Sequence, residues 1–232
     1  PDFVAALCNR SIVFQQNYEY LRALEDINLS ILLEPQNSNL HFNRGSLFSQ
    51  MGDIAGALEN YNKAIQLAPN NAEAFYNKSL LYLSQKEFDK GWDLLHWRSV
   101  NPKQPQQQLQ TSLPVWEPGK VEHRRVLIWA EQGVGDQILF STLLKEAQQQ
   151  IPELHVMLDA RLIPLMERSL KGIRFHPQDK TINQAEFDAH MPIMSLGGVF
   201  RRSQMDFTNA SYPQLIADPE RIAMLRRSLA PE

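Results

Sequence analysis

The sequence predicts an α + α/β protein: an array of helical repeats that forms an α-α superhelix, followed by an α/β domain with a mainly parallel sheet. Leu-Glu-Pro at 33–35 and Leu-Ala-Pro at 67–69 end two helical stretches that are 34 residues apart. In the second half of the chain, short apolar runs alternate with helical patterns, which is typical of strand–helix–strand units. We therefore expect repeats in 1–100, a connector in 101–125 and the α/β domain in 126–232.

The composition fits a folded protein and excludes several classes of function. Of the 232 residues, 43% are hydrophobic and 21% are charged, so wholesale disorder is excluded. The formal net charge is −3, so nucleic-acid binding through bulk charge is not expected. The one cysteine, Cys8, can form neither an internal disulfide nor a cysteine-rich zinc site. This cysteine usage favours a reducing, cytoplasmic location.

Three further signals are missing from the sequence. No apolar run approaches the ~18 residues of a membrane span, so no membrane partner is expected. The first residues, Pro1-Asp2-Phe3, contain neither an initiator Met nor a basic leader, which indicates a piece of a longer chain. The histidines form no His-Glu-x-x-His pattern, so we expect no metal site.

Small and large side chains recur with the 34-residue period through the first hundred residues. The small positions are Ser11, Gly45 and Ser79 on the first helix of each repeat and Ala23, Ala57 and Gly91 on the second. The aromatic positions are Phe14, Phe48 and Tyr82. Two closely packed helices per repeat require this alternation of sizes. In period and residue pattern, this part of the chain resembles the tetratricopeptide repeat family, which implies about three repeats.

One repeat position departs from the family pattern. Where the family has a Leu, this sequence has Arg10, Arg44 and Lys78. We expect this basic series on a face that is exposed to water or occupied by a ligand.

An asparagine series precedes the basic series by one residue. Asn9, Asn43 and Asn77 recur on the first helix of each repeat. A row of amides can both donate to and accept from the backbone of an extended peptide. The row looks like the asparagine ladder of a protein O-glycosyltransferase that holds its substrates with such repeats, which implies peptide binding in a groove. The adjacent cations would favour an acidic partner. Alternatively, Asn is simply common at this repeat position.

The predicted connector, 101–125, is rich in proline and glutamine. Its prolines are Pro102, Pro105, Pro114 and Pro118. Because proline lacks an N–H donor and clashes with the preceding turn, this stretch cannot be one helix.

The α/β domain is predicted from four short apolar runs, at 126–130, 155–159, 173–176 and 188–193. Helical patterns at 137–150 and 162–170 follow the first two runs, and a last helix begins at Pro219. We expect 194–212 to be irregular. The domain is small for a doubly wound fold, so it resembles half of a larger one.

The turn after the first predicted strand carries the candidate chemistry. It reads Glu131-Gln-Gly133-Val-Gly135-Asp136. Glycines let a ligand approach the backbone closely, and the start of the next helix attracts negative charge. The third glycine of a dinucleotide fingerprint is replaced by Ile138, and no Gly-Lys-Ser/Thr exists, so both common phosphate loops are excluded. Asp136 could instead only cap the helix.

The order of several motifs resembles bacterial proteins that join tetratricopeptide repeats to a heptosyltransferase-like glycosyltransferase domain of the GT-B type. These motifs are Gly91-Trp92, His96-Trp97-Arg98, Trp116-Glu-Pro-Gly119, the Glu131–Asp136 turn and Phe187-Asp-Ala-His-Met-Pro192. The resemblance implies that 126–232 is the first Rossmann-like half of such a domain.

The resemblance also implies roles for residues of the turn. It makes Asp136 the general base that deprotonates the acceptor hydroxyl, and it makes Glu131, Gly133 and Gly135 substrate contacts. His190 could face the same crevice, although a structural hydrogen bond would also explain it.

Two functions follow as expectations. In the first, the repeats bind a protein or peptide, and the α/β half forms the acceptor side of a nucleotide-sugar-dependent glycosyl transfer site. The half that binds the nucleotide-sugar donor would lie outside these residues, so they would hold no cofactor and would be inactive alone. In the alternative, the chain is a non-catalytic scaffold or adaptor. A nucleotide-binding oxidoreductase is disfavoured because the dinucleotide fingerprint is incomplete.

Overall fold

The computed structural model describes residues 2–100, 109–210 and 215–229 and divides into two compact units, Pro1–Pro105 and Gln106–Glu232. Residues 101–108 of the predicted connector lie outside the described residues.

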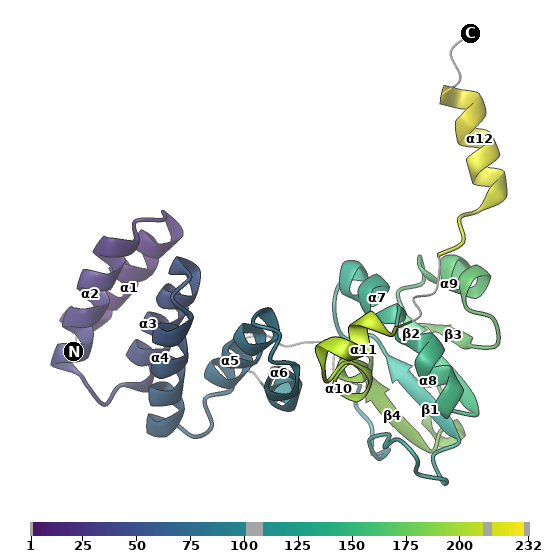
Figure 1. Ribbon diagram of the computed structural model, residues 1–232, viewed down its shortest axis with the longest axis horizontal. Helices are drawn as coiled ribbons and strands as arrows, with labels where there is room; N and C mark the ends of the chain where they lie inside the picture. Colours follow the sequence, from purple (N-terminus) through teal and green to yellow (C-terminus); the bar gives the residue numbers. More distant parts are fainter. Residues whose placement is uncertain (1, 101–108, 211–214, 230–232) are drawn as a thin grey trace. The chain divides into compact units, whose positions relative to one another are not determined.

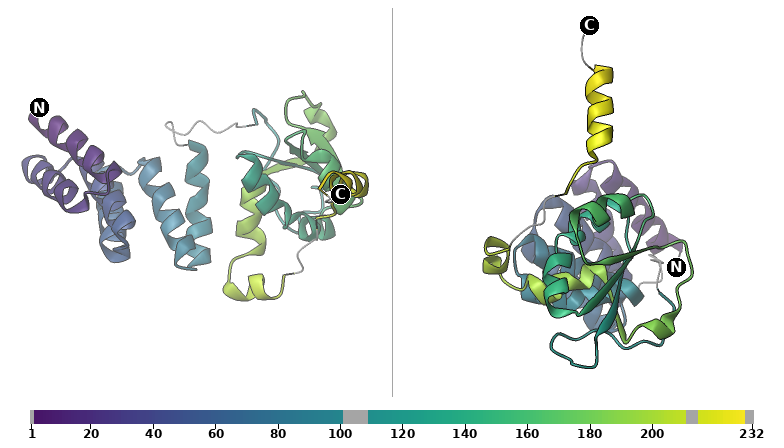
Figure 2. Two further views of the ribbon diagram at one scale, coloured as in Figure 1. Left: turned by 90° about the horizontal axis from the view of Figure 1, so that it is seen from above. Right: turned by 90° about the vertical axis from the view of Figure 1, so that its right-hand side faces the viewer.

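The first unit is built from helix pairs that follow one another along the chain (Figure 1). Its helices are α1 (Asp2–Gln16), α2 (Tyr20–Leu33), α3 (Ser38–Met51), α4 (Ile54–Leu67), α5 (Ala72–Ser84) and α6 (Phe88–Leu95), followed by the 3₁₀ helix η1 (His96–Val100). Within each pair the two helices lie side by side (Figure 2). The predicted helical repeats are confirmed.

Short polar side chains set where these helices begin. The side chains of Asn37, Asp53 and Asn71 accept hydrogen bonds from backbone N–H groups in the first turns of α3, α4 and α5. The turn between α3 and α4 needs Gly52, whose φ of 80° lies in the left-handed region. Two of the caps, Asn37 and Asn71, are one repeat apart, so the period of the sequence also sets the helix starts.

The small residues of the repeat pattern lie where two helices pack closely. Ser11, Gly45, Ser79, Ala23, Ala57 and Gly91 are all buried. A Cβ at Gly45 would lie 2.8 Å from ring carbons of Tyr61, so only a glycine fits beneath that ring. At the last turn of the unit, the rings of Phe75 and Trp97 stack with centroids 4.2 Å apart, which packs η1 onto α5.

The second unit contains a four-stranded parallel sheet in the order β3-β2-β1-β4. The strands are β1 (Arg125–Trp129), β2 (Glu153–Leu158), β3 (Arg174–Pro177) and β4 (Ala189–Pro192). Each of the four predicted apolar runs forms a strand, displaced by at most two residues at either end. The parallel sheet is therefore confirmed.

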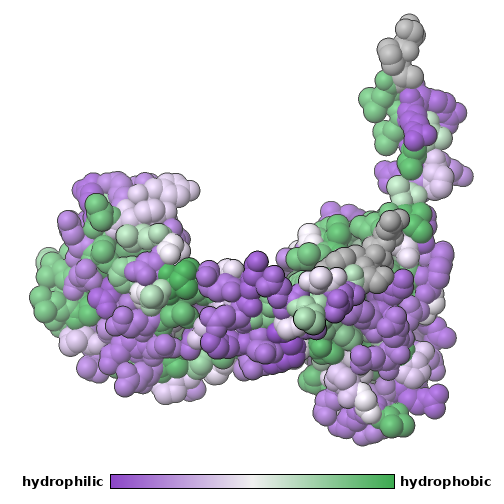
Figure 3. Space-filling view, in the orientation of Figure 1, coloured by the Kyte–Doolittle hydropathy of each residue, from purple (hydrophilic) through white to green (hydrophobic). Residues whose placement is uncertain are grey.

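The helices of this unit follow the strands in sequence. They are α7 (Val134–Ser141), α8 (Leu144–Gln150), α9 (Ile163–Ser169), α10 (Leu196–Phe200), α11 (Gln204–Thr208) and α12 (Pro219–Leu229), with 3₁₀ turns η2 (Gln184–Glu186) and η3 (Ile193–Ser195). No residue of α12 is buried, and Figure 3 shows apolar and polar side chains next to one another on it.

The two faces of the sheet carry different side chains. Val126, Ile128 and Val156 belong to the main core, against which residues of α7–α10 pack. On the other face, Leu127 and Trp129 belong to a smaller cluster that includes Phe187. Because successive residues of a strand point to opposite faces, β1 contributes to both clusters.

Two predicted segments differ from the structure. The helix predicted at 137–150 is two helices, α7 and α8, because the hydroxyls of Ser141 and Thr142 donate to the carbonyls of Ile138 and Leu139, at 2.7 Å each. The expectation that 194–212 is irregular is wrong for its described part, which contains α10 and α11.

A buried ion pair ties α10 to α8. Arg201, which follows α10, donates from Nη1 to Glu146 Oε2 at 2.8 Å and from Nη2 to Oε1 at 2.6 Å. The Arg201 side chain is only 4% exposed. Such a two-point pair fixes the orientation of both side chains.

Candidate functional site

The asparagine series lies on the face that the first helices α1, α3 and α5 share. Asn9 is exposed. Asn43 of α3 donates from Nδ2 to the Cys8 sulfur of α1 at 3.1 Å. Asn77 of α5 and Tyr61 of α4 line the same groove, and burial raises the pKa of the Tyr61 hydroxyl to about 12, against the opposing influence of Asn77. Asn43 and Asn77 therefore lie where neighbouring repeats meet.

A groove of about 300 Å³ runs between α3 and α5 on this face. Its lining consists of small polar residues around a buried tyrosine and two leucines: Ser46, Ser49, Gln50, Tyr61, Asn77, Leu80, Leu81 and Ser84. Of the predicted peptide-binding residues, Asn77 lines this groove.

Sequence reasoning missed the serine and glutamine side chains of the groove. Ser46, Ser49 and Gln50 follow Asn43 at helical spacings of three, six and seven residues. Spacings of three and seven residues lie close to whole helical turns, so Ser46 and Gln50 share a face with Asn43, and Ser49 is a neighbour of Ser46 three residues further on. The signal that could have found them is therefore the helical period counted from Asn43.

The basic series lies elsewhere, on the face formed with the second helices. Arg10 makes a two-point ion pair with Asp26 of α2, at 2.6 and 2.7 Å, and its hydrogen bond lowers the pKa of the Asp26 carboxyl. Lys78 donates to Asn62 Oδ1 of α4 at 2.6 Å. Burial, as the larger cause, and Lys90 lower the pKa of the Lys78 ammonium.

Arg44 occupies the central position of this basic series. It donates to Asn60 Oδ1 of α4 at 2.7 Å and to Asn28 Oδ1 of α2 at 2.9 Å. We define the bonds of Arg10, Arg44 and Lys78 to the second helices as the cation ladder. Adjacent residues of an α-helix are rotated by about 100° from one another, so Asn and the following cation cannot share one face. The structure thus does not bring the two series together in one groove.

The turn between β1 and α7 has a simpler backbone than its glycines suggest. Gly133 is the N-cap, with φ −60° and ψ 168°, and the positive-φ glycines are Gly52, Gly119 and Gly172. Any residue can adopt the backbone of Gly133, so the conformation of this position does not require a glycine. A Cβ built at Gly133 or Gly135 would meet no atom within 4 Å. The space beside both glycines is open.

Asp136 is the third residue of α7 and is half-buried. No side chain caps this helix, so the capping role considered for Asp136 is not observed. Its carboxylate has no hydrogen bond or ion pair to any other described residue. Glu131, by contrast, is buried, with 6% of its surface exposed.

Gln137, which belongs to no recognised sequence pattern, holds the carboxyl ends of β1 and β2 together. Its Nε2 donates to Gln132 O at 2.8 Å, and its Oε1 accepts from the backbone N–H of Asp159 at 2.8 Å. With 1% of its surface exposed, it fixes the loop after β1 to the loop after β2. Asp136 therefore projects from a rigid turn.

His190 lies on the other face of the sheet from α7. Its Nδ1 accepts a hydrogen bond from Trp129 Nε1 at 2.9 Å, and burial lowers its pKa. In register, it pairs with Leu127 of the smaller cluster. The structure does not bring His190 to Asp136, and the structural hydrogen bond considered for this residue is present.

Two more histidines share this second face. His155 and His176 stack with ring centroids 5.2 Å apart and are joined by a hydrogen bond of 2.9 Å between Nδ1 and Nε2. Burial is the largest cause lowering the pKa of both imidazoles. The described residues contain no group of three or more His, Cys, Asp or Glu placed to hold a metal ion.

Comparison with known proteins identifies the repeats. Residues 45–86 match the model of the family described as TPR repeat. No curated protein matches the chain. The N-terminal region therefore contains tetratricopeptide repeats. Within 2–100, 109–210 and 215–229, no helix combines the length and the apolarity that crossing a membrane requires.

Solved structures similar to this chain cover less than half of it. The TPR2B domain of yeast Sti1, in its complex with pHsp70, is 18% identical with a TM-score of 0.40, and the match covers 42% of this chain and 78% of that one. The first TPR of Spaghetti (RPAP3), bound to an HSP90 peptide, is 16% identical with a TM-score of 0.40. This match covers 43% of the present chain and 84% of the Spaghetti chain. The MamA protein is 22% identical with a TM-score of 0.38. This match covers 42% of the present chain and 53% of the MamA chain.

Proposed function

We propose that the repeat unit binds an extended peptide along the face of α1, α3 and α5. The observation that supports this most directly is the groove between α3 and α5, in which Asn77 and Tyr61 lie beside exposed Leu80. Amide and hydroxyl groups bond a peptide backbone without regard to its sequence, and Leu80 adds an apolar contact.

The hydrogen bonds of the asparagine series leave it able to exchange partners. Asn9 is exposed, and Asn43 donates to a thiol, which is a weak acceptor. Exchanging the Cys8 sulfur for a peptide carbonyl would strengthen the bond of Asn43. A peptide along this face would therefore bind to amides that are already positioned by the helices.

The triple variant Asn9→Ala, Asn43→Ala and Asn77→Ala should bind a peptide at least about tenfold more weakly, because hydrogen bonds contribute roughly 0.5–1.5 kcal/mol each. A peptide selected from a random displayed library on the intact chain serves as the probe, and fluorescence anisotropy gives the Kd. The matched control Asn17→Ala with Asn70→Ala, two exposed residues in turns, should bind like the parent. If the triple variant binds the peptide as tightly as the parent and has an unchanged circular dichroism spectrum, peptide binding through these asparagines is refuted.

A second candidate function concerns the α/β unit, which we propose forms the acceptor side of a glycosyl transfer site around Asp136. The observation that favours it is an unpaired carboxylate beside two glycines with open space. This site follows β1, and the carboxyl ends of parallel strands are where open α/β sheets bind ligands. A carboxylate in this position can accept the proton of an attacking sugar hydroxyl.

Asp136→Asn should weaken sugar binding roughly tenfold, because hydrogen bonds to charged groups are worth about 1.5–3 kcal/mol. Saturation-transfer NMR with a panel of monosaccharides measures binding to the intact chain. Asp179→Asn, the same change at an exposed loop residue, should leave the signals unchanged. The acceptor site is refuted if no sugar receives saturation, or if both variants give equal signals.

A further inference from the structure

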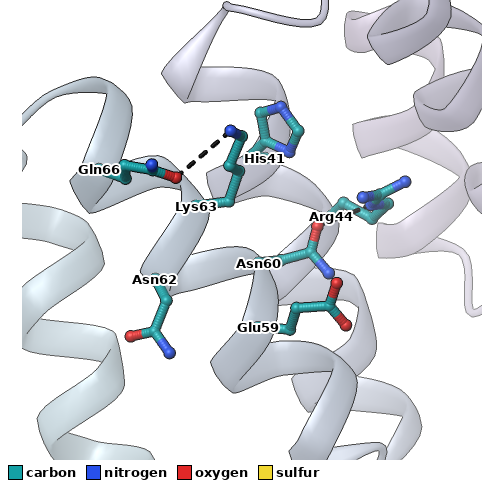
Figure 4. Close-up of a pocket in the computed structure, with 7 residues that line it drawn as sticks. All are labelled: His41, Arg44, Glu59, Asn60, Asn62, Lys63 and Gln66. Carbon is teal, nitrogen blue, oxygen red and sulfur yellow. Dashed lines mark hydrogen bonds between the residues drawn. The ribbon is translucent and has the colours of Figure 1, made fainter.

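A second pocket of the repeat unit lies on the face of the second helices, apart from the asparagine groove. It has a volume of about 560 Å³, within the roughly 300–1,000 Å³ of ligand pockets. Figure 4 shows side chains of α3 and α4 around it, including Arg44, Asn62, Lys63 and Gln66. Neither the proposed peptide groove nor the proposed sugar site includes these residues.

The cation ladder occupies the amide oxygens of Asn60 and Asn62, two residues that line this pocket. Asn60 Oδ1 accepts from Arg44 Nε at 2.7 Å, and Asn62 Oδ1 accepts from Lys78 Nζ at 2.6 Å. An amide whose oxygen is already bonded offers its NH₂ group to a further partner. Asn60 Nδ2 already donates to Gly56 O at 2.8 Å, but Asn62 Nδ2 has no acceptor among the described residues.

The same arrangement recurs at Gln66. Its Oε1 accepts from Lys63 Nζ at 3.3 Å, as the dashed line in Figure 4 shows, so its NH₂ group is left as a donor. Lys63 has three donors and uses one of them in this bond. The pocket is thus rich in N–H donors, and its lining also includes two acceptor groups, the Glu59 carboxylate and Nδ1 of His41.

The charged side chains of the pocket give it a net positive charge, which favours the same anionic partner as the N–H donors do. Arg44 and Lys63 line it, and Glu59 is the one carboxylate among its lining residues. Burial lowers the pKa of the Arg44 guanidinium, against the opposing influence of Glu59. A bound anion would reduce the unfavourable effect of that burial.

Arg44 is also held in place before any ligand arrives. Its bonds to Asn28 and Asn60 come from two different helices, α2 and α4. Rigid placement of a recognition group lowers the entropy lost on binding. The remaining N–H groups of the guanidinium fork can therefore bond a carboxylate in a fixed geometry.

We propose that this pocket binds an acidic peptide segment, whose carboxylates accept hydrogen bonds from Arg44, Asn62, Lys63 and Gln66. Small-molecule sites are predominantly apolar and aromatic, whereas amide and charged side chains dominate this lining. An acidic segment remains partly hydrated when bound, so it is compatible with a pocket lined by polar side chains. This binding does not depend on the asparagine groove.

Two substitutions test the proposal, one that removes a positive charge from the pocket and one that removes a negative charge. The probe is a fluorescein-labelled peptide of alternating Glu and Ser, with its Gln and Ser counterpart as the uncharged reference. Lys63→Gln should weaken binding of the Glu peptide about two- to fivefold, and Glu59→Gln should strengthen it by about the same factor, as expected for exposed charges. Binding should also weaken as salt is raised.

Lys145→Gln is the control, because it removes one exposed positive charge from α8 of the other unit. It should leave the affinity unchanged. Equal binding of the two peptides would overturn the proposal, and so would equal affinities of the Lys63 and Lys145 variants. If the triple asparagine variant abolishes binding of the Glu peptide while Lys63→Gln does not, the groove is the acidic site and this second pocket is not.

Discussion

Replacing Glu146 by Gln lowers the free energy of unfolding of the α/β unit by about 3 kcal/mol, because removing the carboxylate of a buried ion pair leaves its partner's charge with less compensation. The charge in question is the Arg201 guanidinium, which is 4% exposed and donates to both oxygens of Glu146. Glu146 is 25% exposed, which keeps the expected loss at the lower end for buried pairs. Hydrogen exchange of the β1 and β2 amides measures the loss.

The matched control is Glu117→Gln, which breaks the ion pair with Lys120 in the same unit. Glu117 is 65% exposed, so its pair contributes about 0–1 kcal/mol. Equal effects of the two substitutions would show that the Arg201 pair does not stabilise this unit.

Replacing Gly45 by Val destabilises the repeat unit by about 3 kcal/mol, at the upper end for overpacking. The added Cβ would lie 2.8 Å from two ring carbons of Tyr61 and 3.3 Å from the Ala57 carbonyl oxygen. Tyr61 is 2% exposed and belongs to a core cluster with Ala57 and Leu81, so moving its ring would disturb that packing. Urea denaturation followed by far-ultraviolet circular dichroism measures the change, since helices dominate that signal in the repeats.

Ala55→Val is the control for helix propensity, because Ala55 lies on the exposed side of α4. It should lower stability by less than about 0.7 kcal/mol. If Gly45→Val has no greater effect than Ala55→Val, then α3 and α4 do not pack as closely as the structure shows.

The repeats could be predicted because their packing is local and periodic. Ser11, Gly45 and Ser79 recur at one interval, and each small residue meets a neighbouring helix. The 34-residue period does not tell which helix face Asn43 or Arg44 occupies, because both residues recur with the same period. Only their rotation about the helix axis separates them.

The strands could also be predicted from the sequence, since continuous apolar runs are typical of strands in a buried parallel sheet. The parts of the candidate site that could not be predicted depend on contacts between distant segments. Gln137 acts through its bond to the Asp159 loop, and His190 is fixed by Trp129, which lies 61 residues away. No local pattern encodes such partners.

The cation ladder has a mechanical consequence for the repeat unit. Arg44 joins α3 to α2 as well as to α4, and Lys78 joins α5 back to α4. Separating one repeat from the next would break these bonds, so they contribute to the coupling between adjacent repeats on which the stability of the array depends.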